Sequence, residues 1–109
     1  MKDKILDIIS EIKELNTLDN KTIPERILKY DEEFGEFSAE LCKLLGLTHK
    51  PYDKEHLTEE MADVIQVLFS IYLDICTKTG ITMEEVFDEI PIKNNKWREK
   101  IPNYTKNKI

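Results

Sequence analysis

Pairs of carboxylates separated by three residues occur on two segments of this chain, and they are its side chains best suited to holding a metal ion. Glu33 and Glu36 form the first pair, and Glu60 and Asp63 form the second. Because successive residues of a helix turn by about 100°, positions i and i+3 share one face. Each pair lies on the shoulder of an apolar helical stripe, so packing of the two stripes would bring the four acids together.

Carboxylates crowded beside an apolar core repel one another, and a divalent cation relieves that repulsion. An all-oxygen ligand set favours Mg²⁺, with Mn²⁺ as the alternative, over zinc. A di-iron carboxylate bundle needs a histidine three residues after a glutamate on two helices. Here Ala39 follows Glu36 and Gln66 follows Asp63 at that spacing. These residues therefore predict a magnesium site.

A solvated acidic face is the simpler alternative for the same residues, because helix glutamates usually pair with Lys or Arg three or four positions along. None of the four acids has a Lys or Arg at those positions onward, and Glu32 and Glu36 form a like-charge i, i+4 pair. Acids clustered in this way add nothing to stability by themselves. The residue types alone leave both interpretations open.

Helical periodicity positions these acids and runs through most of the chain. Apolar residues recurring at i, i+3, i+4 and i+7 predict helices over about residues 2–16, 22–45 and 82–90, and a third helix that ends near residue 78 and begins at Asp53 or Thr58. The acidic pairs fall on the second and third of these segments. The expected fold is all-α: an antiparallel helical bundle of about four helices with an irregular C-terminal tail, forming a single domain over residues 1–109.

The predicted helix boundaries follow from capping residues and helix breakers. Thr22 and Thr82 each precede a glutamate by three positions, which is the capping-box pattern. Gly46 and Gly80 suit the residues after a helix end. Pro91 is expected to stop or kink the fourth helix, leaving a basic, polar tail over residues 92–109.

Composition narrows the function classes. The chain has 109 residues and a formal net charge of −6, which disfavours tight binding to a nucleic acid polymer or an anionic membrane. Cys42 and Cys76 stand apart among apolar residues, which indicates reduced core thiols. His49 and His56 are expected to be solvated loop residues. No secretory signal pattern or membrane-spanning run is present, so we expect a cytoplasmic protein.

The acidic motifs resemble a known signature. Glu32-Glu33-Phe34-Gly35-Glu36 followed by Glu60-Met61-Ala62-Asp63 is similar to the EExxE…ExxD pattern of the MazG-like, all-α nucleoside triphosphate pyrophosphohydrolases. The surrounding segments PERILKYDEEFGEFSAEL and LTEEMADVIQVLFSIYL also look like the second and third helices of that family. The resemblance covers about residues 20–98. Each half-motif alone is weak, and the two together, at this separation and in this helical context, carry the resemblance.

The resemblance implies an activity: Mg²⁺-dependent cleavage of a nucleoside triphosphate into a nucleoside monophosphate and pyrophosphate, in a nucleotide-pool housecleaning role. Glu33, Glu36, Glu60 and Asp63 would be the metal ligands, with Glu32 as an additional acidic group behind them. Glu33 or Glu36 would orient or deprotonate the attacking water. This chemistry needs neutralised phosphoryl charge and a nucleophile held in line.

The resemblance also implies contacts to phosphate or sugar after the third helix. The polar residues in that place are Lys93, Asn94, Asn95, Lys96 and Arg98. Trp97 is expected to anchor the tail, with base stacking as the alternative. Asn16, at the end of the first helix, is a candidate base contact. Many family members are homodimers or homotetramers, and Phe69 and Ile71 beside the third stripe would suit an inter-chain seam.

Two other functions remain as alternatives at this stage. The first is a non-enzymatic helical module that dimerises or acts as an adaptor and keeps the same fold. The second is the same fold acting on a different phosphoanhydride, such as phosphoribosyl-ATP. This alternative is disfavoured because the chain lacks the fuller sequence signature expected of an enzyme acting on that substrate.

Overall fold

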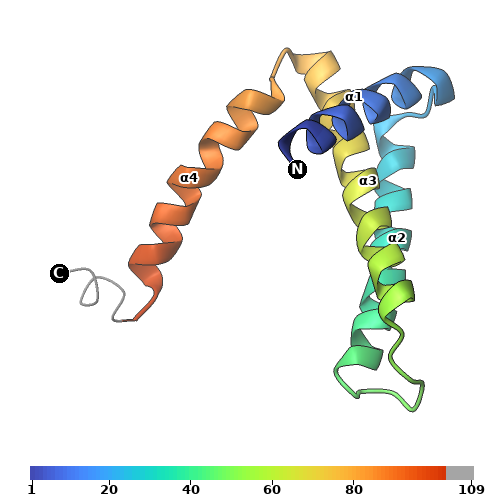
Figure 1. The fold of residues 1–109 in the computed structure, drawn as a ribbon. Coiled ribbons are helices and arrows are strands. Elements are labelled where there is room, and N and C mark those ends of the chain that lie inside the picture. The colour runs from blue at the N-terminus through green and yellow to red at the C-terminus, as the bar shows by residue number, and fades with distance from the viewer. Residues whose placement is uncertain (103–109) are drawn as a thin grey trace. The chain divides into compact units, whose positions relative to one another are not determined.

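The computed structural model describes residues 1–102 and is built from four helices (Figure 1). Within those residues there is no strand, so the predicted all-α fold with about four helices is confirmed. No single helix of this part of the chain is long and apolar enough to cross a membrane, although α3 and α4 taken together meet the length and composition criterion. The helices are α1 (Lys2–Asp19), α2 (Ile23–Leu44), α3 (Lys54–Thr79) and α4 (Met83–Lys100).

The chain forms two compact units, Met1–Ile75 and Cys76–Ile109. The first unit holds α1, α2 and most of α3, and therefore both acidic pairs. In this unit α2 and α3 lie side by side and antiparallel, and α1 crosses them near the start of α2 (Figure 1). Its buried apolar side chains are Ile12, Val67, Ile71 and Leu73. Ile71 is thus a core residue of its own chain, and the inter-chain seam stays a prediction.

Local sequence explains where the helices of the first unit begin and end. The Glu25 amide donates to Thr22 Oγ1 at 3.3 Å and the Thr22 amide donates to Glu25 Oε1 at 3.0 Å, so the predicted capping box starts α2. Asp53 accepts from two backbone amides in the first turn of α3. Gly46 and Gly80 follow α2 and α3 with φ of 71° and 80°, a conformation that glycine adopts without strain.

Two predicted boundaries were wrong. Helix α1 continues past residue 16 to Asp19, because the Thr17 hydroxyl bonds back to the Glu14 carbonyl at 2.6 Å and Asp19 is held by a later helix. Helix α4 continues through Pro91 to Lys100. A proline removes one backbone donor, and the helix-forming residues on both sides keep the remaining turns intact. The predicted irregular tail is therefore helical over residues 92–100, and its last residues, 103–109, lie outside the described part.

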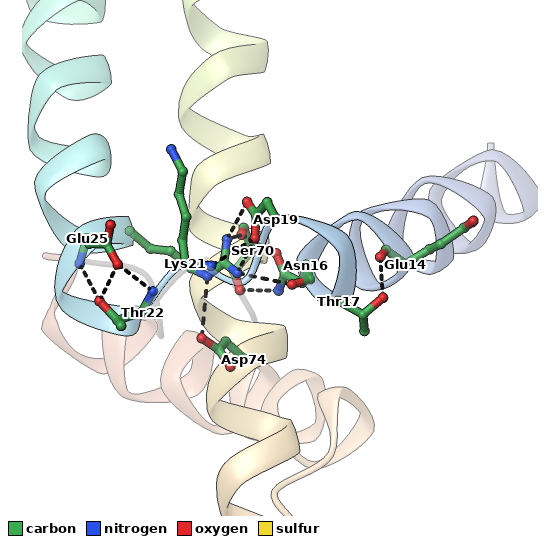
Figure 2. Close-up of polar contacts among 10 residues, drawn as sticks. Glu14, Asn16, Thr17, Asp19, Lys21, Thr22, Glu25, Ser70 and Asp74 are labelled. Atoms are coloured by element: carbon green, nitrogen blue, oxygen red, sulfur yellow. Dashed lines mark hydrogen bonds and ion pairs between the residues drawn. The ribbon is translucent and has the colours of Figure 1, made fainter.

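A buried arginine joins the three helices of the first unit. Arg26, only 5% exposed, extends from α2. Its guanidinium reaches Asp19 Oδ1 of α1 at 2.8 Å, and Ser70 Oγ and Asp74 Oδ2 of α3 at 3.0 and 3.4 Å. Figure 2 shows Asp19, Ser70 and Asp74 converging on this point, with Asn16 beside them. The cluster fixes the C-terminal end of α1 against the α2–α3 pair.

Replacing Arg26 with alanine should lower the free energy of unfolding by about 3 kcal/mol, because removing one member of a buried charge network leaves its partners unpaired. Urea unfolding followed by circular dichroism measures the loss. Lys13→Ala, at an exposed position of α1, is the matched control and should change stability by under about 0.5 kcal/mol. Equal stability of the two variants would show that the arginine cluster does not hold α1 in place.

The same cluster predicts a pH dependence. The hydrogen bond from Arg26 holds the pKa of Asp19 below its ordinary value. The ionised carboxylate therefore adds stability that is complete above the ordinary aspartate pKa, about 3.9, and is lost as the pH falls through the lower folded-state pKa. Wild type should accordingly be more stable than Asp19→Asn at pH 6, and the difference should shrink in acid. Parallel urea titrations at several pH values check this, and a difference that grows in acid contradicts it.

Candidate metal centre

Glu33 is the centre of the acidic cluster. It lies on α2 and is only 7% exposed, although it is a glutamate. One of its carboxylate oxygens lies within 4.8 Å of oxygens from Glu60 and Asp63 on α3. A second group within the same distance joins Glu33 to Glu32 and Glu36 on α2. The structure thus brings the predicted acids together in two overlapping groups that share Glu33.

Unpaired buried oxygens test whether a cation fits these groups. Among the described residues, Glu33 Oε2 and Glu60 Oε2 are buried without a hydrogen-bond partner. Burying a carboxylate oxygen without a partner costs several kcal/mol, roughly, unless a cation accompanies it. The donor set consists entirely of carboxylate oxygen, which hard divalent cations prefer. The residues present therefore fit a Mg²⁺ or Mn²⁺ ion better than they fit a bare acidic surface.

The raised pKa values of three carboxylates in the cluster also indicate a site suited to a cation. The pKa of Glu36 is raised chiefly by the charge of Glu33, then by burial and by the charge of Glu60. The pKa of Glu60 is raised chiefly by burial, with the charges of Asp63 and Glu33 adding to it. Burial and the charge of Glu33 likewise raise the pKa of Asp63. These carboxylates lie in a negative potential that a bound cation would neutralise.

A lysine belongs to the cluster and was missed in the sequence. Lys29 Nζ lies 2.9 Å from Glu33 Oε1 and 3.5 Å from Glu32 Oε1. The search for cations considered only positions after each acid, whereas Lys29 precedes Glu33 by four residues. Lys29 therefore occupies one oxygen of Glu33 and leaves Oε2 for another partner. A search for cations four residues before each acid would have revealed Lys29 in the sequence.

A groove between α1 and α3 reaches the acidic cluster. It consists of two adjoining hollows of about 260 and 390 Å³, which share Ile12, Leu15 and Gln66. Lys29 lines the smaller hollow and Asp63 lines the larger one. The larger hollow is lined mainly by aliphatic side chains, whereas the smaller one is lined mainly by polar and charged side chains.

Asn16, the candidate base contact, has a structural role in this groove. Its amide nitrogen donates to the Ser70 carbonyl at 2.8 Å, and its amide oxygen accepts from the Ser70 hydroxyl at 2.5 Å. These bonds tie α1 to α3, as Figure 2 shows for the labelled pair. A contact between Asn16 and a base stays a prediction.

The expected phosphate-binding residues lie on α4, in the second compact unit, and are Lys93, Asn94, Asn95, Lys96 and Arg98. All five are exposed helix residues, and Arg98 Nη1 donates to Asn95 Oδ1 at 2.6 Å. Trp97 is exposed on the same helix. Their substrate contacts and the anchoring role of Trp97 stay predictions.

Comparison with known proteins decides the family. The model of the MazG nucleotide pyrophosphohydrolase domain matches residues 21–102, a span that holds both acidic pairs and α4. The chain belongs to the MazG family. Searches of curated proteins and of solved structures found no match. The MazG resemblance inferred from the two acidic motifs is thereby confirmed, and the family is generally dependent on a divalent metal.

Proposed function

We propose that this MazG chain is a Mg²⁺-dependent nucleoside triphosphate pyrophosphohydrolase that releases a nucleoside monophosphate and pyrophosphate. Its role would be housecleaning of the nucleotide pool. The observation that carries the proposal is the pair of buried, unpartnered oxygens of Glu33 and Glu60 on facing helices within the family match. Membership in this family favours an enzyme over a non-enzymatic adaptor.

Each acid has a role in this proposal. Glu33, Glu60 and Asp63, with Glu36, hold the Mg²⁺ ion, and Glu32 adds negative charge beside them. When bound, the ion neutralises charge on the phosphoryl oxygens. Lys29 holds one oxygen of Glu33, which orients its carboxylate.

Glu36 is the better placed of the two candidate bases. Its side chain is exposed, whereas Glu33 is buried and one of its carboxylate oxygens is paired with Lys29. It accepts the proton of the attacking water as the bond between the α-phosphate and the bridging oxygen breaks, and pyrophosphate leaves with that oxygen. Glu33 orients the same water in this account.

The groove between α1 and α3 is the proposed nucleoside site. It adjoins the acids through Asp63 and Lys29, and the mainly aliphatic lining of its larger hollow suits the faces of a base.

The basic residues Lys93, Lys96 and Arg98 of α4 are proposed to contact phosphate or sugar. The double variant Lys96→Gln with Arg98→Gln should then raise KM for the nucleotide.

The test is pyrophosphate release from a panel of ribo- and deoxyribonucleoside triphosphates with Mg²⁺. Wild type should turn over at least one of them, and Glu36→Gln and Asp63→Asn should be strongly impaired. Asp7→Asn removes one exposed acid of α1 and is the matched control. Absence of turnover on every nucleotide would rule out this function.

A homodimer or homotetramer in the cytoplasm completes the proposal. Apolar side chains are exposed along α1 and α3, among them Leu6, Ile65 and Met61, and a second copy would cover them. Light scattering coupled to size-exclusion chromatography tests it, and a monomer at micromolar concentration contradicts it.

A further inference from the structure

A basic hollow lies at the loop that joins α2 to α3, within the first compact unit. Its volume is about 530 Å³, and three lysines contribute to its walls. Asp53 is the single acid there, and its carboxylate already caps α3 and lies 3.7 Å from His56. The hollow therefore presents net positive charge in a chain that is acidic overall. Its lining is Lys43, Lys50, Pro51, Tyr52, Asp53, Lys54 and His56.

One of these lysines is held in place. The Lys43 ammonium lies 2.7 Å from Glu40 Oε1, and the two side chains are only 19% and 13% exposed. The other oxygen of Glu40 is buried without a partner among the described residues. An ammonium has three donors, and Glu40 occupies one of them. Lys43 is thus an oriented cation at the wall of the hollow, unlike a freely rotating surface lysine.

The hollow lies next to the acidic cluster, on the side away from the α1–α3 groove. Lys43 follows Glu36 by seven residues on α2, and Lys54 precedes Glu60 by six on α3, so each is roughly 9–11 Å along the helix from the acids. Because α2 and α3 are antiparallel, both displacements point toward the same loop (Figure 1). Lys29, which lines the groove, lies one turn before Glu33, in the opposite direction. The acids therefore lie between the α1–α3 groove and a basic hollow.

We propose that the hollow binds the pyrophosphate end of the nucleotide, with Lys43, Lys50 and Lys54 as its phosphate contacts. The substrate then runs from the groove, across the acidic cluster, to the α2–α3 loop. This inference rests on the proposed pyrophosphohydrolase function. Ammonium groups bind phosphate oxygens as point charges and keep the terminal phosphates away from the carboxylates. After cleavage the hollow holds the leaving pyrophosphate.

The test compares product inhibition in wild type, Lys43→Gln, Lys54→Gln and the double variant. With Mg²⁺ present, inorganic pyrophosphate and the nucleoside monophosphate are each added as inhibitors. We expect each substitution to raise the inhibition constant of pyrophosphate and the KM of the triphosphate about tenfold, the size of one charge-assisted contact. The inhibition constant of the monophosphate should not change. Lys13→Gln is the control for loss of one positive charge.

The outcomes separate this inference from the function on which it rests. Lys54 is exposed, so Lys54→Gln tests the hollow even if Lys43→Gln unfolds. Active variants with an unchanged pyrophosphate inhibition constant would overturn the proposed hollow and leave the hydrolase intact. A rise in that constant only for Lys96→Gln with Arg98→Gln would place the pyrophosphate on α4 and also overturn it. If wild type releases no pyrophosphate from any nucleotide, the proposed function is wrong, and the inference that rests on it is overturned as well.

Discussion

Glu33→Gln should reduce pyrophosphate release by about a thousandfold or more. Glu33 is the only residue common to both acidic groups, and its buried Oε2 has no partner among the described residues. The glutamine keeps the size of the side chain but removes the charge that binds a cation. Loss of a residue that orients a metal ligand costs about 10- to 100-fold in metal affinity or activity, and loss of a direct ligand costs more.

Steady-state kinetics at saturating Mg²⁺ measures this effect on kcat. Asp7→Asn, which removes an acid from an exposed position of α1, should retain wild-type kcat. Circular dichroism establishes that the Glu33→Gln chain is folded. A folded Glu33→Gln enzyme with more than a tenth of wild-type kcat contradicts the central role of this carboxylate.

Mg²⁺ should raise the melting temperature of the wild-type protein by roughly 10 °C at a concentration 100 times the dissociation constant. Binding to the native state alone contributes about 2.7 kcal/mol under that condition, and each kcal/mol shifts the melting temperature of a chain of this size by about 4 °C or more. The carboxylates of Glu36, Glu60 and Asp63 have raised pKa values, so their ionised forms oppose folding when no cation is bound.

The same reasoning predicts opposite effects for Glu60→Gln. Without Mg²⁺ at neutral pH, this variant should melt at or above the wild-type temperature, because one repelling charge is gone. With Mg²⁺ it should gain little. Differential scanning fluorimetry measures both, with NaCl at equal ionic strength as the control for screening. An equal Mg²⁺ effect in wild type and Glu60→Gln would remove Glu60 from the metal site.

The acidic pairs could be predicted because their arrangement is local. Spacing of three residues on an amphipathic helix puts Glu33 and Glu36, or Glu60 and Asp63, on one face whatever the rest of the fold does. The capping box at Thr22 is equally local and was confirmed. The continuation of α4 through Pro91 was not predicted, because a proline within a short periodic segment indicates a helix end.

Long-range contacts account for most of what the sequence did not reveal. The sequence does not single out Arg26, since its partners Ser70 and Asp74 lie 44 and 48 residues away. The hollow at the α2–α3 loop depends on how that loop places Lys43 and Lys54, and helical periodicity does not describe the conformation of a loop. Ile71 is buried whereas its neighbour Tyr72 is 37% exposed, and that difference depends on how the helices pack rather than on the apolar stripe alone.

Product analysis of one hydrolysed nucleoside triphosphate tests the central claim most directly. Phosphorus NMR of the reaction, with Mg²⁺ and with excess EDTA, identifies which bond is cut and whether the metal is needed. The predicted result is one pyrophosphate for each nucleoside monophosphate, only with Mg²⁺, and neither product from Glu33→Gln. Release of single phosphate with a nucleoside diphosphate, or equal turnover in EDTA, would contradict the account.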